Sequence, residues 1–155
     1  MEAITPALLR EHGIRAVMVD LDDTLVPSKG ELLSDSARAW LLGLREAGIP
    51  VLILSNGTRL RVDRWKAELE LPGFHMVGKP FWFAYRRGLR MLGVKAAETA
   101  MVGDQIFTDV LGANLAGLTS VLVEPLSAGK LVHTRLLRKV EQRILKGGHG
   151  ESLNR

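Results

Sequence analysis

The chain has 155 residues, a length typical of a single globular domain, and 46% of them are hydrophobic while 25% are charged. It contains no cysteine, which excludes disulfides, thiolate metal ligands and a cysteine nucleophile. The formal net charge of +4 and the isoelectric point near 9.8 favour anionic partners such as phosphate esters, anionic lipid surfaces or nucleic acid.

Short apolar runs alternate along the chain with amphipathic stretches that begin or end at capping residues or glycine. The apolar runs predict strands at 16–22, 51–54, 75–78, 99–102 and 119–123. The amphipathic stretches predict helices at 5–12, 34–47, 60–69, 81–92, 106–116 and 130–146. This alternation predicts an α/β fold, a doubly wound three-layer sandwich around a central parallel sheet. Residues 1–146 are expected to form a single domain and residues 147–155 a disordered tail.

The first predicted strand is a continuous apolar run that ends abruptly in polar residues: Asp20, Asp22, Asp23 and Thr24. Buried parallel strands have this pattern, and ligands of open α/β sheets bind at the carboxyl ends of such strands. While the backbone stays extended, Asp20 and Asp22 share a face. Three acids at one strand end need a positive partner, most simply Mg²⁺. Turn capping is the alternative explanation for Asp22, Asp23 or Thr24.

Polar residues also follow three other predicted strands: Ser55 and Asn56, then Lys79, then Asp104 with Asp109. The carboxyl ends of parallel strands lie on one edge of the sheet, so these side chains are expected to converge. Acids, a hydroxyl and a lysine together suit phosphoryl transfer, with one carboxylate as nucleophile and another as general acid. Taken alone, Ser55 and Asn56 fit an ordinary turn, Lys79 a solvated loop and Asp109 a helix surface.

The four strand ends resemble, in order, the four motifs of the haloacid dehalogenase superfamily of phosphohydrolases. The matching segments are 20–25, 55–56, 79–80 and 103–109, within a resemblance that covers residues 17–123. Segments 22–27 and 103–110 look like the YqeG-type branch of subclass III, which is related to phosphatidylglycerophosphate phosphatase. One departure is Asp23, where many members carry glycine; it leaves the pair of Asp20 and Asp22 intact but bears on the turn that follows.

The resemblance implies a metal and proton-transfer role for each acid. Asp20 is then the nucleophile and a Mg²⁺ ligand, while Asp22 is the general acid and base and offers its backbone carbonyl to the metal. Asp104 is a further metal ligand. Asp109 either supports the metal site or orients Lys79, and the resemblance does not choose between these roles.

The resemblance also implies which residues bind the phosphoryl group. Ser55 donates to the phosphoryl oxygens together with backbone N–H groups around Asn56, and Lys79 neutralises charge on the phosphoryl group and on Asp20. Thr24 lies in the same motif and either contacts substrate or holds the motif loop, the second being favoured.

Neither segment 26–50 nor segment 57–78 has room for the cap domain that superfamily members often insert there. An open site implies a bulky substrate or closure by a partner subunit, because water must still be excluded. The basic helix predicted at 130–146 either docks on the sheet or is attracted to anionic lipid. A lipid phosphate such as phosphatidylglycerophosphate is therefore one candidate substrate, whereas the aromatic run 81–83 is expected to lie in the core.

These observations predict a Mg²⁺-dependent phosphomonoester hydrolase that works through an aspartyl-phosphate at Asp20. A phospho-accepting receiver domain and a non-catalytic interaction protein on the same fold are the alternatives from other classes. No motif indicates specific nucleic-acid binding, and the oligomeric state stays open. Without a signal-peptide pattern or a run of membrane-spanning length, the expected location is the cytoplasm, with peripheral membrane contact through 130–146 as an addition.

Overall fold

The computed structural model describes residues 1–28 and 32–127. Within them, a five-stranded sheet has the strand order β3-β2-β1-β4-β5, and every neighbouring pair is parallel. The strands are β1 (Ala16–Val19), β2 (Val51–Leu54), β3 (Gly73–Phe74), β4 (Thr99–Gly103) and β5 (Thr119–Leu122). The predicted α/β fold with a central parallel sheet is confirmed.

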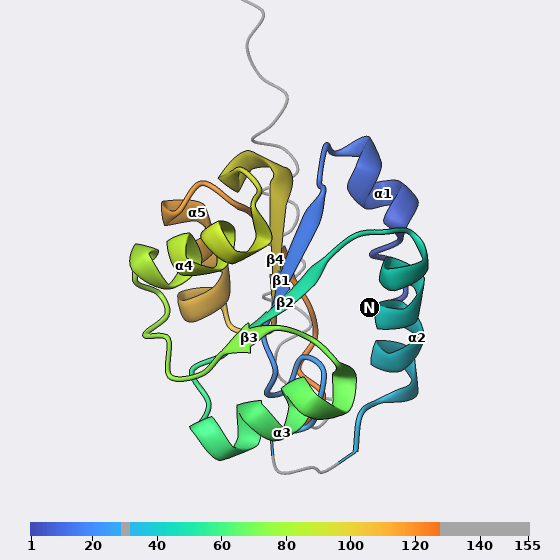
Figure 1. The fold of residues 1–155 in the computed structure, drawn as a ribbon, viewed down its shortest axis with the longest axis vertical. Coiled ribbons are helices and arrows are strands. Elements are labelled where there is room, and N and C mark those ends of the chain that lie inside the picture. The colour runs from blue at the N-terminus through green and yellow to red at the C-terminus, as the bar shows by residue number, and fades with distance from the viewer. Residues whose placement is uncertain (29–31, 128–155) are drawn as a thin grey trace, which may run out of the picture.

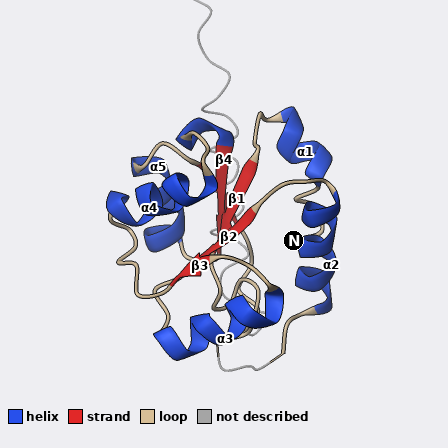
Figure 2. Ribbon diagram, viewed as in Figure 1, coloured by secondary structure: helices blue, strands red, loops and turns tan. Residues whose placement is uncertain are grey.

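Helices cover both faces of this sheet (Figures 1 and 2). On one side lie α1 (Pro6–Glu11) and α2 (Asp35–Glu46), and on the other lie α4 (Trp82–Leu92) and α5 (Leu111–Leu115). The remaining helix, α3 (Arg59–Leu69), follows β2 and packs Val62 and Trp65 into the same hydrophobic cluster as α1 and α2. The chain therefore forms the three layers expected of a doubly wound fold.

The central strands are buried on both faces, which explains their continuous apolar sequences. In β1, Val17 and Val19 pack into the cluster with α1, α2 and α3, whereas Met18 packs into the cluster with α4 and α5. All three side chains are fully buried. Alternation of successive residues between two covered faces is the packing of a central parallel strand.

Several predicted boundaries are wrong. The third strand is residues 73–74 rather than 75–78, because Met76 and Gly78 have positive φ angles of 45° and 74°, which extended backbone does not allow. The first strand ends at Val19 rather than at residue 22. The predicted helix 106–116 is a π-helical turn at Ile106–Val110 followed by α5.

The prediction that the aromatic run 81–83 lies in the core is also wrong. Phe81, Trp82 and Phe83 are 62%, 53% and 52% exposed. Phe81 is the N-cap of α4 and Trp82 and Phe83 are its first two residues, whereas the buried residues of the helix start at Ala84 and Tyr85. More than half of each of these three side chains is therefore left outside the core.

The described residues place no cap domain over the sheet: no strand or helix lies between β1 and α2, and only β3 lies between α3 and α4. The same residues include no helix long and apolar enough for a membrane span. The predicted helix 130–146 and the predicted tail 147–155 lie outside the described residues.

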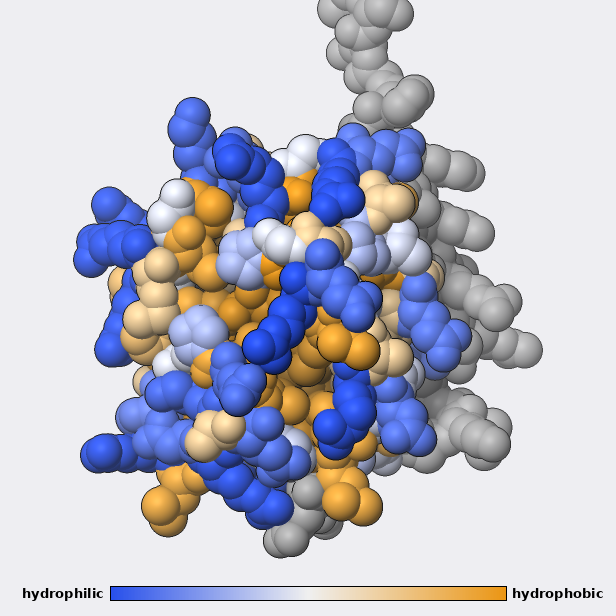
Figure 3. Space-filling view, turned by 45° about the vertical axis from the view of Figure 1, so that its right-hand side comes forward, coloured by the Kyte–Doolittle hydropathy of each residue, from blue (hydrophilic) through white to orange (hydrophobic). Residues whose placement is uncertain are grey.

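One face of the molecule carries a hollow in which hydrophobic side chains show between hydrophilic ones (Figure 3). A cavity of about 450 Å³ lies between α2 and α3, and its lining includes Leu41, Arg45 and Leu69. None of the residues that line it belongs to the predicted site.

Candidate active site

The predicted convergence of strand ends is present. Asp20 follows β1, Ser55 follows β2 and Asp104 follows β4, and β1 pairs with both of the other strands. The Lys79 ammonium lies 2.6 Å from Asp20 Oδ1 and 2.7 Å from Asp109 Oδ1. Residues 20, 79 and 109 are thus brought into direct contact from three separate segments of the chain.

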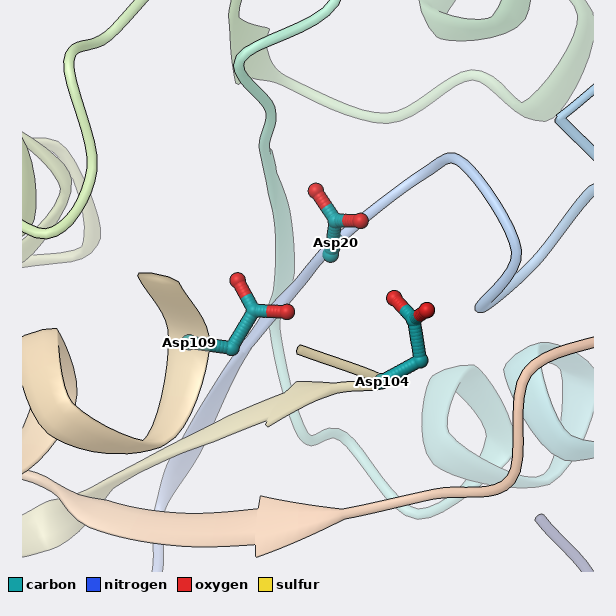
Figure 4. A group of neighbouring side chains, drawn as sticks. All are labelled: Asp20, Asp104 and Asp109. Carbon is teal, nitrogen blue, oxygen red and sulfur yellow. The ribbon is translucent and has the colours of Figure 1, made fainter. Parts of the chain in front are cut away.

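Three carboxylates gather around one space at this edge of the sheet. Asp20, Asp104 and Asp109 each offer an oxygen, and these oxygens lie within 4.8 Å of one another. Figure 4 shows the three side chains rising from β1, β4 and the turn after β4 toward a common region. Asp20 and Asp109 are buried, and Asp104 is half-buried.

The electrostatics of this cluster call for another cation. Burial raises the pKa of Asp20 to about 7, against the opposing pull of Lys79 and with help from the charge of Asp109. Burial and the charge of Asp109 likewise raise the pKa of Asp104 to about 6. One lysine does not balance three carboxylates, and an oxygen donor set of this kind suits a hard divalent cation. The cluster therefore fits a metal ion of the Mg²⁺ type.

Lys79 is fixed from both ends. Burial lowers the pKa of Lys79, but the attraction of Asp20 and Asp109 outweighs it, so the pKa lies above its ordinary value and the group stays charged. Its backbone is clamped by Asn56, whose Oδ1 accepts from Lys79 N–H at 2.9 Å and whose Nδ2 donates to the Lys79 carbonyl at 3.1 Å. The Asn56 side chain thus positions the lysine, and phosphate binding by the surrounding N–H groups stays a prediction.

Asp109 contacts Lys79 and also belongs to the carboxylate cluster, so the geometry supports both roles that the sequence left open. Its second oxygen, Oδ2, accepts from Gln105 N–H at 3.1 Å within the π-helical turn. The hydroxyl of Tyr85, which lies on α4, donates to the carbonyl of Thr108 at 2.5 Å and so links the π-helical turn to that helix. Burial, followed by the charges of Asp109 and Asp20, raises the pKa of Tyr85, so it remains a donor.

Gly103 leaves the space that Asp109 occupies, because a methyl group at this position would overlap the Asp109 carboxylate. Gly103→Ala is therefore expected to cost about 1–3 kcal/mol of unfolding free energy through overpacking, and to lower activity by displacing Asp109. Urea unfolding measures the first effect. Gly43→Ala on α2 is the matched control: nothing lies within 4 Å of its added methyl, and alanine should stabilise that helix. Equal stability changes in the two variants would contradict this assignment.

Asp22 has a partner that the sequence did not reveal. Arg61, on α3, donates from Nε to Asp22 Oδ1 at 2.5 Å and from Nη2 to the Pro27 carbonyl at 2.9 Å. A methyl at Gly57 would lie 2.9 Å from Asp22 Oδ2 and 3.1 Å from Ser55 Oγ, so the carboxylate and the hydroxyl flank the same glycine. β1 ends at Val19, before both residues, and the two carboxylates have different cationic partners, Lys79 for Asp20 and Arg61 for Asp22. That Asp20 and Asp22 share one face stays a prediction.

Two hydroxyls complete the surroundings. Ser55 is buried, and its Oγ accepts from Gly57 N–H at 3.0 Å, which leaves its own proton to donate. Thr24 is buried and its Oγ1 lies 3.2 Å from Asp104 Oδ1, as donor to that carboxylate. Thr24 therefore holds Asp104, in line with the favoured alternative for this residue.

The departure at Asp23 has a structural reason. Its φ of 60° lies in the left-handed region that favours glycine and that aspartate tolerates better than most residues. In this conformation the Asp23 carboxylate accepts hydrogen bonds from the backbone N–H groups of Ser28 at 3.0 Å and Ser127 at 3.1 Å. Burial alone raises the pKa of Asp23, but the hydrogen bonds from the two serines lower it overall. Asp23 thus ties the loop after β1 to the segment after β5.

Comparison with known proteins agrees with this geometry. The family model described as HAD-hydrolase-like matches residues 76–129, which include Lys79, Asp104 and Asp109. The chain is 35% identical over 142 residues to the probable phosphatase YqeG of Bacillus subtilis, covering 92% of this chain and 83% of that protein. It is 28% identical to phosphatidylglycerophosphate phosphatase 1 of Arabidopsis thaliana, over 90% of this chain and 43% of that protein.

A solved structure shares the fold. The cobalt-bound form of the deoxy-D-mannose-octulosonate 8-phosphate phosphatase of Haemophilus influenzae superposes with a TM-score of 0.60 at 25% identity, covering 70% of this chain and 68% of that one. The chain therefore belongs to the haloacid dehalogenase superfamily and is a phosphatase of that type. Within the superfamily, it groups with YqeG. The receiver domain and the non-catalytic interaction protein are not favoured by these relatives.

Proposed function

We propose that this protein is a Mg²⁺-dependent phosphomonoester hydrolase that forms an aspartyl-phosphate on Asp20. The observation that carries the proposal is the contact of Lys79 with Asp20 and Asp109 beside Asp104. Asp20, Asp104 and Asp109 would hold the metal, together with the backbone carbonyl of Asp22. A Mg²⁺ ion bound there would neutralise charge on the transferring phosphoryl group.

The side chains of this chain then divide the reaction between them. The Asp20 carboxylate attacks phosphorus as the bond to the ester oxygen breaks, and the carboxyl of Asp22 gives its proton to that leaving oxygen. Asp22 next takes a proton from the water that hydrolyses the aspartyl-phosphate, which releases inorganic phosphate and restores Asp20. Ser55 and Lys79 bind the phosphoryl oxygens throughout, where fixed donors stabilise the charge of the transition state.

A phosphatase screen over lipid, sugar and nucleotide phosphates tests this function, with Mg²⁺ present or with EDTA added. We expect phosphate release in Mg²⁺ and its loss in EDTA. Failure to hydrolyse any phosphomonoester in Mg²⁺ would remove the proposal.

A lipid phosphate is the substrate class that we favour. The name of the Arabidopsis relative, phosphatidylglycerophosphate phosphatase, supports this choice, and so does the net charge of +4 of the chain. In the screen, phosphatidylglycerophosphate is expected to have a higher kcat/KM than soluble sugar or nucleotide phosphates.

The effect of Mg²⁺ on stability is expected to depend on pH. The pKa values of Asp20 and Asp104 are raised from 3.8 to about 7 and about 6, so the folded state holds these protons more tightly than the unfolded chain. Their contribution to stability is therefore present below about pH 4 and is lost as the pH rises toward about 7. Because Mg²⁺ binds the ionised carboxylates, it offsets that loss.

The quantity to measure is the difference in Tm between samples with Mg²⁺ and samples with EDTA. We expect this difference to be small near about pH 5 and to increase up to about pH 8. A difference that stays constant with pH would contradict metal binding at these two carboxyls.

A further inference from the structure

Three consecutive aromatic side chains lie exposed at the start of α4. Phe81 and Phe83 stack with ring centroids 5.6 Å apart, and Trp82 meets Phe83 edge-on at 6.4 Å, so the three form one cluster. All are more than half exposed. Folded proteins expose single large apolar residues commonly, but contiguous exposed aromatics mark interaction surfaces.

This cluster stands next to the phosphate-directed residues. Phe81 follows Lys79 by two residues, and its N–H donates to the carbonyl of Gly78 at 3.0 Å. A fourth exposed aromatic, Phe107, is 68% exposed and precedes Asp109, the partner of Lys79, by two residues in the chain. We call Phe81, Trp82, Phe83 and Phe107 the aromatic rim.

Positive charge accompanies the aromatic rim. The sequence of α4 contains three arginines and no acidic residue. The guanidinium of Arg86 lies 5.0 Å from the ring centre of Trp82, which belongs to the rim. Aromatic rings with adjacent guanidinium groups match the boundary of an anionic bilayer, where rings enter the headgroup region and cations contact phosphates.

We propose that the aromatic rim docks this protein on an anionic phospholipid bilayer, with the mouth of the site toward the headgroups. A phosphate on a lipid headgroup lies close to the bilayer surface, so an enzyme that takes it must bring the surroundings of its site into contact with that surface. The substrate assignment rests on the function proposed above, whereas the docking is a binding event that is measured without turnover.

Tryptophan fluorescence tests the docking directly, because the three tryptophans differ sharply in exposure. Trp40 and Trp65 are buried at 6% and 0% exposure, whereas Trp82 is 53% exposed. With the full chain and vesicles of brominated phosphatidylcholine and phosphatidylglycerol, we expect quenching of the emission. We expect the Trp82→Phe variant, which keeps an aromatic ring, to bind the same vesicles but to lose most of the quenching.

Vesicle flotation supplies the second readout. Combining Phe81→Ser with Trp82→Ser is expected to lower the partition coefficient on phosphatidylglycerol-containing vesicles at least about tenfold. Met91→Ser is the matched control, since Met91 has the same 53% exposure as Trp82 but lies at the opposite end of α4. It should bind like the wild type. Urea unfolding of each variant confirms that it is folded.

The docking proposal is overturned if the wild type does not float with the vesicles. It is also overturned if the wild type floats but its Trp82 emission is not quenched, or if the double serine variant floats as well as the wild type. A dimer that the double serine variant disrupts, with no vesicle binding by the wild type, would assign the rim to a protein interface instead. A protein that docks through Trp82 but hydrolyses no phosphate ester would sink the proposed function and leave the docking in place.

Discussion

The Asp20→Asn variant is expected to lose turnover at least about a thousandfold, because an amide does not attack phosphorus to form the acyl phosphate. The fold should survive. An asparagine oxygen can still accept from the Lys79 ammonium, which lies 2.6 Å from Asp20 Oδ1. The substitution also removes one of three crowded carboxylates. Steady-state phosphate release and a thermal unfolding curve measure the two effects.

Asp63→Asn is the control for this experiment. Asp63 lies on α3, where it pairs with Arg59 and Lys66 at the surface. It is not part of the carboxylate cluster. That variant should turn over like the wild type. Wild-type activity in Asp20→Asn would contradict the assignment of Asp20 as the nucleophile. If Asp20→Asn does not fold, the same measurements are made on Asp20→Ser.

The Lys79→Met variant is expected to lose both activity and stability. Removing the ammonium leaves Asp20 and Asp109 buried without their common cation, and breaking such a pair typically costs about 3–5 kcal/mol. The loss should lie near the lower figure, because Asp20, with a pKa already raised to about 7, can take up a proton. Turnover should fall at least about a hundredfold, since a fixed charge on the phosphoryl oxygens is removed.

Urea unfolding in EDTA and in Mg²⁺ separates these contributions. Mg²⁺ is expected to restore part of the lost stability but not the activity, because a divalent ion replaces the missing positive charge without replacing the phosphoryl contact. Lys66→Met, which removes a half-exposed surface partner of Asp63, should leave the unfolding free energy close to that of the wild type. If Lys79→Met were as stable as Lys66→Met in EDTA, the buried ion pair would not exist in solution.

The parts of the fold that follow from local pattern were predictable. In β1, β2 and β4 every residue is buried. Their continuous apolar sequences were therefore enough to predict strands of a parallel sheet. The site followed from topology, because parallel strands bring their carboxyl ends to one edge whatever the sequence between them. Asp20 and Asp104 were found in this way, and the contact of Lys79 with both Asp20 and Asp109 agrees with it.

The features that depend on tertiary contact were not predictable. Arg61 looks in the sequence like any basic residue on the polar face of a helix, and only the folded loop after β1 places Asp22 beside it. The third strand shifted because Met76 adopts a positive φ, which its residue type does not indicate. The exposure of Trp82 depends on which turn of α4 first meets the sheet, and hydrophobicity alone predicts burial.

A crystal structure grown with Mg²⁺ and beryllium fluoride, a mimic of the acyl phosphate, bears most directly on the role of Asp20. We expect the beryllium bonded to an Asp20 oxygen, the metal in contact with Asp20 and Asp104, and the Lys79 ammonium beside the fluorides. A bare Asp20 with beryllium fluoride on another side chain, or a metal bound away from Asp20 and Asp104, would contradict the mechanism.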